Sequence, residues 1–274
     1  DWTNETAEFM QGNGDGSFRF QLGSNLPNPR FSTGPVAATR ALAVGLLDND
    51  DIPDVVYTNY YGYQNDFTIY PHNYISLNLS SSSVDNPLPD SYGTGQGPTA
   101  IAIGDVDGDG HNDLAIANGL GNTVSIRLNN GDGSFSNTPM TYGVGSMPQD
   151  LAFGDFNQDG RLFLVVSTAN GNDVSILFNQ GNGSFANAVS VSAGHNPYAL
   201  AVGDMNGDGR ADIAVANYSG GITLLLNQAD GTFASSSSVY DGAGYSTRIN
   251  YAVGGTAIAL GDINRDGYLD VVIT

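Results

Sequence analysis

AIAIGDVDGDGHNDLAIAN, residues 100–118, is the stretch of sequence that decides the fold. It holds a short apolar run, then a segment rich in Asp and Gly, then a second short apolar run. Short runs of Val, Ile and Ala that alternate or stay apolar are typical of strands rather than of helices. The stretch therefore predicts two neighbouring strands joined by an acidic loop.

The same stretch recurs along the chain, with aligned glycines 49 to 59 residues apart, a spacing that fits one four-stranded blade per unit. The four other copies are ALAVGLLDNDDIPDVVYTN at 41–59, DLAFGDFNQDGRLFLVVST at 150–168, ALAVGDMNGDGRADIAVAN at 199–217 and AIALGDINRDGYLDVVIT at 257–274. Alternating runs with Gly-rich turns follow three of the copies: TVSIRLNNGDGSF at 123–135, DVSILFNQGNGSF at 173–185 and GITLLLNQADGTF at 221–233. Such turns between apolar runs predict β-hairpins, so each unit holds four strands.

These units predict an all-β fold, a five-bladed β-propeller of four-stranded blades that forms a single domain over residues 1–274. The units lie around 41–90, 100–140, 150–190 and 199–240, and the fifth joins 257–274 to 1–20. FMQGNGDGSF at 9–18 matches a third strand, its turn and the start of a fourth, whereas the last unit stops after two strands. N- and C-terminal strands would thus share one blade and close the ring. An open array, or donation of the N-terminal strands to a neighbouring molecule in a filament, stays possible.

The composition excludes several function classes. Eight basic residues stand against 28 acidic ones, for a net charge of −20, which disfavours binding to nucleic acid or to an anionic membrane surface. The absence of Cys removes disulfides and thiol chemistry. No apolar run is long enough for a transmembrane segment, and the N-terminus has no signal-peptide pattern, which fits a mature secreted chain or a cytosolic one.

The acidic loops predict metal sites of the form D-x-[DN]-x-D-G-x-x-D. Oxygens at positions 1, 3 and 5 of a tight loop converge on one point, Gly at position 6 permits the turn, and the carbonyl at position 7 and the acid at position 9 complete the shell. Oxygen donors alone favour Ca²⁺ over transition metals. Three loops are intact: Asp105, Asp107, Asp109, His111 and Asp113; Asp204, Asn206, Asp208, Arg210 and Asp212; and Asp262, Asn264, Asp266, Tyr268 and Asp270.

Two further loops are damaged copies of the pattern. Phe163 replaces the closing acid after Asp155, Asn157, Asp159 and Arg161, and Leu46 replaces the first acid before Asp48, Asp50 and Asp54. We therefore expect about three firm Ca²⁺ sites and up to five in all. Ions at extracellular concentration would stabilise the fold, whereas cytosolic calcium would leave such sites empty.

Nearly the whole chain resembles the FG-GAP repeats, also called VCBS-like repeats, of integrin α-subunit propellers, fungal propeller lectins and many bacterial surface proteins. The resemblance rests on GDVDGDGHNDLAIAN, GDMNGDGRADIAVAN and GDINRDGYLDVVIT, together with the turns NNGDGSF, NQGNGSF and NQADGTF. It implies a calcium-binding propeller at the cell surface or outside the cell that acts as a binding or adhesion module for glycan or an extracellular protein. Five blades depart from the seven that are usual in that family.

Loops ahead of the first strands offer candidate ligand-binding residues, namely Gln96, Met147, His195 and Tyr198. They lie at one face of the ring, although packing between blades is the simpler explanation of such residues. Catalysis has little support, because the three His residues lie in separate loops and the repeat accounts for most carboxylates. A structural subunit of a surface assembly and a glycoside hydrolase are the alternatives to a binding module. N-glycosylation sequons begin at Asn4, Asn78, Asn182 and Asn217.

Overall fold

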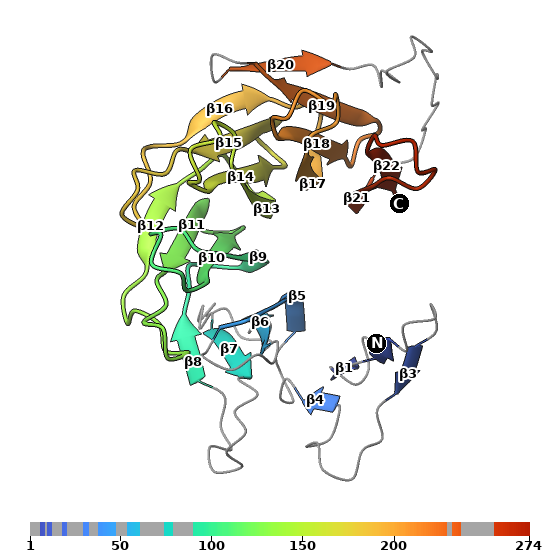
Figure 1. Cartoon of the computed structure of the whole chain (residues 1–274). Helices are drawn as coiled ribbons and strands as arrows, with labels where there is room; N and C mark the ends of the chain where they lie inside the picture. The colour runs from blue at the N-terminus through green and yellow to red at the C-terminus, as the bar shows by residue number, and fades with distance from the viewer. Residues whose placement is uncertain are drawn as a thin grey trace, which may run out of the picture.

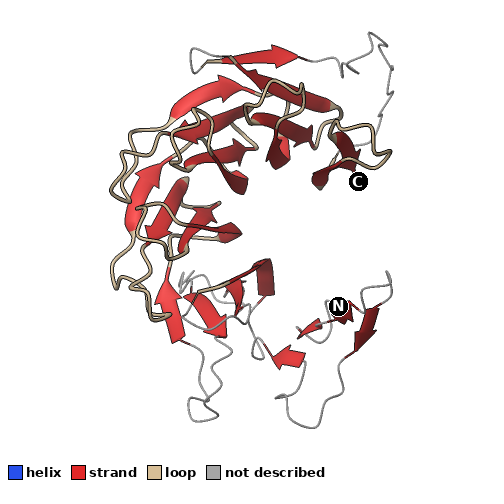
Figure 2. Ribbon diagram, viewed as in Figure 1, coloured by secondary structure: helices blue, strands red, loops and turns tan. Residues whose placement is uncertain are grey.

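The computed structural model describes residues 6–8, 10–12, 18–20, 30–32, 38–47, 54–60, 74–78, 90–228, 232–236 and 255–274. Within these residues the chain forms strands, turns and bends and no helix (Figure 2). The predicted all-β class is therefore confirmed for the described part of the chain. No helix there is long and apolar enough to cross a membrane.

Four sheets of the described chain are four-stranded, antiparallel and built from consecutive strands. The first is β5 (Ala38–Gly45), β6 (Asp54–Tyr60), β7 (Tyr74–Asn78) and β8 (Asp90–Gly93). The second is β9 (Pro98–Gly104), β10 (Asp113–Asn118), β11 (Thr123–Arg127) and β12 (Met140–Gly143). The third is β13 (Pro148–Gly154), β14 (Phe163–Thr168), β15 (Asp173–Leu177) and β16 (Val189–Ser192). The fourth is β17 (Pro197–Gly203), β18 (Asp212–Asn217), β19 (Ile222–Asn227) and β20 (Phe233–Ser236).

These sheets follow one another along an arc as the blades of a propeller (Figure 1). The first strand of each sheet lies on the inner side of the arc, and the fourth lies on the outer side. Neighbouring blades touch through their inner strands, β5 with β9, β9 with β13, β13 with β17 and β17 with β21 (Ile258–Gly261). We number the blades 1 to 4 from β5 onward.

The two ends of the chain supply half-blades. β21 pairs with β22 (Asp270–Ile273) as a first and second strand would. At the N-terminus, β1 (Thr6–Glu8) pairs with β4 (Arg30–Ser32), and β2 (Met10–Gly12) pairs with β3 (Phe18–Phe20).

The N-terminal pairs have the register of a third and a fourth strand. Gly12 lies opposite Phe18 as Asn129 lies opposite Phe135 in blade 2, and Ala7 lies opposite Phe31 as Val124 lies opposite Tyr142. No pairing between β22 and the N-terminal strands is found among the described residues. The blade count of five and the closure of the ring therefore stay predictions.

The core lies between successive blades. All residues of the second strands β10, β14 and β18 are buried, because both faces of each sheet are covered by a neighbouring sheet. Small side chains such as Ala115 and Ala214 alternate with larger ones such as Leu164 and Ile213, so that adjacent sheets approach closely.

Candidate metal loops and ligand face

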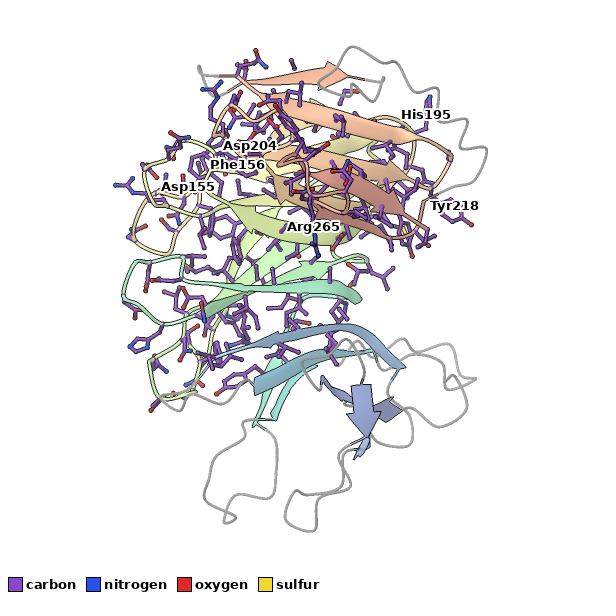
Figure 3. The ribbon with its side chains drawn as sticks, turned by 45° about the vertical axis from the view of Figure 1, so that its right-hand side comes forward. Asp155, Phe156, His195, Asp204, Tyr218 and Arg265 are labelled. Carbon is purple, nitrogen blue, oxygen red and sulfur yellow. The ribbon has the colours of Figure 1, made fainter. Side chains whose placement is uncertain are left out.

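The strand order gives every blade two chemically different ends. The acidic loops follow the first strands and lie at the same end as the hairpin turns between third and fourth strands, whereas the loops ahead of the first strands lie at the other end. Figure 3 shows Asp155 and Asp204 at one end of the sheets, and His195 and Tyr218 at the other. We call these the loop face and the cleft face.

In blade 2 the predicted convergence of oxygens is present. Ligand atoms of Asp105, Asp107 and Asp109 all lie within 4.8 Å of one another. The two oxygens of Asp105 accept the N–H groups of Gly108 (2.7 Å) and Gly110 (2.9 Å). These glycines have φ of 79° and 91°, a conformation that L side chains rarely adopt, and this lets the loop wrap around Asp105.

Asp113 closes this loop from below and is completely buried. Its two oxygens accept N–H groups from Val106 in the loop and from Asn129 after the third strand, both at 2.8 Å. Burial raises the pKa of Asp113 from 3.8 to about 6, against the two backbone donors, which lower it. The residue predicted as the last metal ligand therefore also ties the loop to the third strand.

The loop of blade 4 repeats this arrangement. Asp204 accepts the N–H groups of Gly207 (2.8 Å), Asp208 (3.1 Å) and Gly209 (2.7 Å). Buried Asp212 accepts from Met205 (3.0 Å) and Asn227 (2.8 Å), and burial raises its pKa.

The loop after β21 shares most of this pattern. Asp262 accepts the N–H groups of Asp266 (3.1 Å) and Gly267 (3.0 Å), and Asp270 accepts that of Ile263 (2.8 Å). The three intact sequence motifs thus fold into loops of the same kind.

The damaged loop of blade 3 differs where its sequence differs. Phe163, at the closing position, is buried and packs against Phe156 and Phe178, with ring centroids 6.1 and 5.1 Å apart. One oxygen of Asp155 accepts the N–H of Gly160 (2.9 Å), and the other, Oδ1, is buried with no hydrogen-bond partner. A bound cation would satisfy that oxygen, which fits a metal loop that retains its first acid.

The remaining predicted ligands are the residues at position 7 and those of the damaged loop of blade 1. The position 7 residues His111, Arg161, Arg210 and Tyr268 each donate their backbone N–H to the acid at position 5, at 2.8 to 2.9 Å. Arg210 also forms an ion pair with Asp208 at 2.7 Å. In the damaged loop of blade 1, Asp48 and Asp50 lie outside the described residues, and Asp54 begins β6. The Asp and Asn side chains of the described loops offer oxygen atoms as ligands, which fits Ca²⁺.

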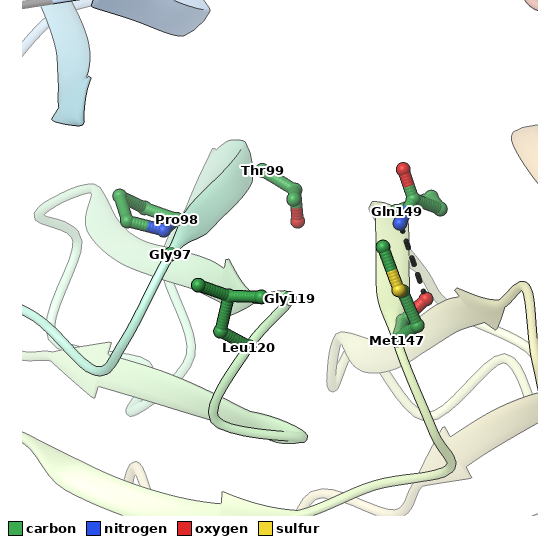
Figure 4. Close-up of a pocket in the computed structure, with 7 residues that line it drawn as sticks. All are labelled: Gly97, Pro98, Thr99, Gly119, Leu120, Met147 and Gln149. Carbon is green, nitrogen blue, oxygen red and sulfur yellow. Dashed lines mark hydrogen bonds between the residues drawn. The ribbon is translucent and has the colours of Figure 1, made fainter. Parts of the chain in front are cut away.

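A pocket on the cleft face lies between blades 2 and 3 (Figure 4). Leu120 and Met147 line it from opposite sides, and their side chains are 55% and 40% exposed. Its other lining residues are Gly97, Pro98, Thr99, Gly119 and Gln149. The pocket is thus open and largely apolar at its mouth.

Met147 holds an unusual backbone conformation for its residue type. Its φ is 61°, where the equivalent loops have Gly97 (63°) and Asn196 (61°). The loop is fixed by the N–H of Met147, which donates to Asn122 Oδ1 at 2.8 Å, and by its carbonyl, which accepts the N–H of Ala169 at 3.0 Å. The left-handed conformation costs free energy for a residue such as Met, which distinguishes this loop from those that have Gly or Asn at the same position.

A second pocket lies between blades 3 and 4, and its lining is polar: Ala169, Asn170, Asn172, His195, Asn196 and Ser219. Asn170 links the two pockets, because its amide donates to Met147 Sδ of the first pocket at 3.6 Å. Beside Ser219, the rings of Tyr198 and Tyr218 lie 5.8 Å apart, and Tyr218 is 54% exposed.

The structure brings together three of the four predicted ligand residues. Met147 lines the first pocket and His195 the second, and the ring of Tyr198 lies against that of Tyr218, which precedes Ser219 of the second pocket. Gln96 is exposed, and its carbonyl accepts from Leu120 and Gly121. Sequence reasoning missed Leu120, Asn170, Ser219 and Tyr218, which come from the turns between second and third strands. The differences among these turns from blade to blade are the signal that points to them.

The predicted sequons fall in different environments. Asn182 is exposed in the hairpin turn of blade 3, where its Oδ1 accepts from Ser184, and Asn217 is buried and donates to Thr223 Oγ1 at 3.0 Å. Asn78 ends β7, and Asn4 lies outside the described residues.

A family model described as FG-GAP-like repeat matches the chain four times, over residues 47–116, 105–166, 163–215 and 204–273. The matches together span well over half of the chain. Among curated proteins, none matches it.

Two solved structures have a similar fold. BBS1N, in complex with ARL6DN, has a TM-score of 0.53 and 14% identity, covering 90% of this chain and 66% of its own. A functionally unknown protein from Desulfotomaculum acetoxidans DSM 771 has a TM-score of 0.55 and 17% identity, covering 87% of this chain and 67% of its own. The chain therefore spans about two thirds of the length of these structures, and at such identities the likeness concerns the fold alone.

Proposed function

The chain belongs to the FG-GAP-like repeat family, and from this premise we propose that it is a non-catalytic, extracellular binding module whose ligand is a glycan. In this proposal calcium ions in the loop face stabilise the propeller, and the cleft face binds the ligand. The observation that carries it is the separation of the two chemistries: acidic loops at one end of the blades and uncharged pockets at the other.

Three loops would hold the calcium ions through their oxygens at positions 1, 3 and 5. The convergence of Asp105, Asp107 and Asp109 supports this assignment, and so does the partnerless oxygen of Asp155 in the weaker loop. A bound divalent cation supplies positive charge among carboxylates that otherwise repel one another. Because such loops fill at extracellular calcium concentrations and not at cytosolic ones, the proposal includes an extracellular location.

The propeller is proposed to close as a ring of five blades. Val272 on β22 is 46% exposed, although its counterparts Val56, Ala115, Val165 and Ala214 are completely buried. Across the arc, Leu42 and Val44 of β5 are also exposed. The counterparts of Val272 pack against the following blade, so in a closed ring blade 1 would cover this face of β22. A third strand from the chain's own N-terminus would pair with the edge of β22.

The repeat fixes the register of that closing strand. Ile213 and Val215 of blade 4 lie opposite Leu225 and Thr223. The equivalent pairing places Val271 opposite Met10 and Ile273 opposite Glu8. Donation of the same strands to a second copy is the competing arrangement, and it would give dimers or filaments instead of monomers.

The two pockets suit an uncharged, hydroxyl-rich ligand. Their described lining residues include no Asp, Glu or Arg, in a chain whose net charge is −20. Asn170, Asn172 and His195 can donate and accept hydrogen bonds, as hydroxyl groups require. Tyr218 offers an exposed ring on which the apolar face of a sugar can stack. An extended peptide would instead seek a sheet edge, which the pockets do not provide.

A glycan array of the full chain, read with calcium and with EGTA, tests the proposal. We expect binding that is lost with Met147→Gly and with His195→Ala. Met147→Gly removes only the side chain, since glycine holds the same conformation at Gly97, so the fold is kept. Asp132→Asn on the loop face is the control and should bind as the wild type does. The proposal would be contradicted if the wild type bound no glycan. It would also be contradicted if Met147→Gly and His195→Ala bound glycan as well as the wild type does.

A further inference from the structure

A buried Asn lies at the end of the third strand, or two residues beyond it, in each of blades 2, 3 and 4. Asn129, Asn179 and Asn227 are only 4%, 7% and 2% exposed. Their amide groups share one bonding pattern, with one donated bond within the blade and another to the preceding blade.

The bond within the blade reaches the loop at the residue before the closing position. Asn129 Nδ2 donates to the carbonyl of Asn112 (2.9 Å), Asn179 to that of Leu162 (3.2 Å) and Asn227 to that of Ala211 (3.1 Å).

The bond between blades reaches the second residue of the preceding loop. Asn129 donates to the carbonyl of Leu47 (2.9 Å), Asn179 to that of Val106 (2.8 Å) and Asn227 to that of Phe156 (2.6 Å). These three acceptor residues are at most 4% exposed, and the neighbouring blade supplies each buried carbonyl with a hydrogen-bond donor.

Val106 shows why this bond matters for the loop. It lies between Asp105 and Asp107, its N–H donates to Asp113 Oδ2 and its carbonyl accepts from Asn179. The backbone between two proposed metal ligands is thus held on one side by its own blade and on the other side by the next blade. Hydrogen bonds that orient ligands in this way usually affect metal affinity strongly.

We propose that Asn179 is a positioning residue for the calcium loop of the preceding blade, so that the loop at 105–113 is completed only when blade 3 packs against blade 2. This inference rests on the proposed calcium binding. Asn129 and Asn227 hold the loops of blades 1 and 3 in the same way. These two loops are the damaged ones, since each lacks one acid of the pattern.

The chain provides a matched control. Asn179→Ala removes a bond to an intact preceding loop, and Asn227→Ala removes an equally buried bond to the damaged loop of blade 3. To read the loop at 105–113 without the other two intact loops or the weaker loop of blade 3, both variants are made in full-length protein that also carries Asp155→Ala, Asp208→Ala and Asp266→Ala. Calcium affinity is measured by titration calorimetry, and hydrogen exchange of residues 105–113 is measured without metal.

We expect Asn179→Ala to weaken calcium binding about tenfold, as is usual for residues that orient metal ligands, and to speed exchange at 105–113. Asn227→Ala should change neither the calcium affinity nor the exchange at 105–113. Both variants should lower the melting temperature, because each removes a buried hydrogen bond. Unchanged affinity and exchange in Asn179→Ala, or equal losses in both variants, would overturn the inference. If the background protein binds no calcium, calcium binding itself fails, and the exchange measurement still decides whether Asn179 positions the loop.

Discussion

Asp113 illustrates, at the scale of one residue, how an acidic loop is held when its carboxylate is buried. Both of its oxygens accept backbone N–H groups, from Val106 and Asn129. Asp113→Asn replaces one acceptor with a donor and leaves a buried N–H without a partner. We expect a loss of about 1–3 kcal/mol in the free energy of unfolding without metal, measured by urea denaturation.

Asp132 serves as the control for this substitution. It lies exposed in a hairpin turn and accepts from Ser134 through one oxygen, which Asn can replace. Asp132→Asn should leave the urea midpoint unchanged. An equally small effect of Asp113→Asn would show that the loop does not depend on its buried carboxylate.

The raised pKa of Asp113 predicts a pH effect in the metal-free protein. Because its folded pKa of about 6 exceeds the ordinary 3.8, the folded state binds the proton more tightly than the unfolded state does. This contribution to stability is present below pH 3.8 and is lost as the pH rises through 6. In EGTA, lowering the pH from 7 to 5 should therefore stabilise the wild type more than Asp113→Asn. Parallel pH curves for the two proteins would contradict this.

At the scale of elements, a glycine ends the inner strand of each of blades 1 to 4, and the next blade leaves no room for a side chain there. A Cβ at Gly104 would lie 2.9 Å from Leu162 Cδ1 and 3.0 Å from Phe153 Cδ2 of blade 3. Gly104→Ala should cost about 1–3 kcal/mol of stability through overpacking, measured by chemical denaturation. Gly143→Ala on the outer strand has nothing within 4 Å and is the neutral control. Equal stability of the two variants would show that blades pack more loosely than described.

The elements were largely predictable from sequence, and the reason is that their signals are local. Alternating apolar runs fix the strands, and Asp and Gly at fixed spacing fix the loop at 105–113. The position of Leu120 beside Met147, or of Asn179 beside Val106, arises only when separate blades pack together. No local pattern reports such a contact, so these parts of the site could not be predicted.

At the scale of the whole molecule, the proposed closure of the arc into a ring makes a prediction about Gly261. Gly261 of β21 has nothing within 4 Å, whereas Gly203 would meet Leu260 and Leu269, and Gly45 would meet Ile103. In a closed ring, Val44 of blade 1 would stand against Gly261 as Ile103 stands against Gly45. Closure therefore predicts that Gly261→Ala destabilises the monomer about as much as Gly104→Ala does, by about 1–3 kcal/mol.

Gly261→Ala is compared with Gly104→Ala and Gly143→Ala in the same denaturation experiment. Behaviour like that of Gly143→Ala would mean that the arc stays open at β21. Size-exclusion chromatography of the wild type then separates the two ways of closing, because strand donation between copies gives dimers or larger species.

The net charge of −20 also takes on a meaning at this scale. Much of it lies in the acidic loops, which we propose to bind calcium. For a Kd of about 0.1 mM and about 1 mM calcium, each site would contribute roughly 1.4 kcal/mol, and three would contribute about 4 kcal/mol. That is a substantial part of the stability of a typical domain.

Thermal unfolding of the full chain in about 1 mM calcium and in EGTA, with magnesium as the control, tests the calcium-stabilised propeller most directly. A gain of about 4 kcal/mol predicts a melting temperature about 10 °C higher in calcium than in EGTA, with a smaller effect of magnesium. The same melting temperature in calcium and in EGTA would contradict the account.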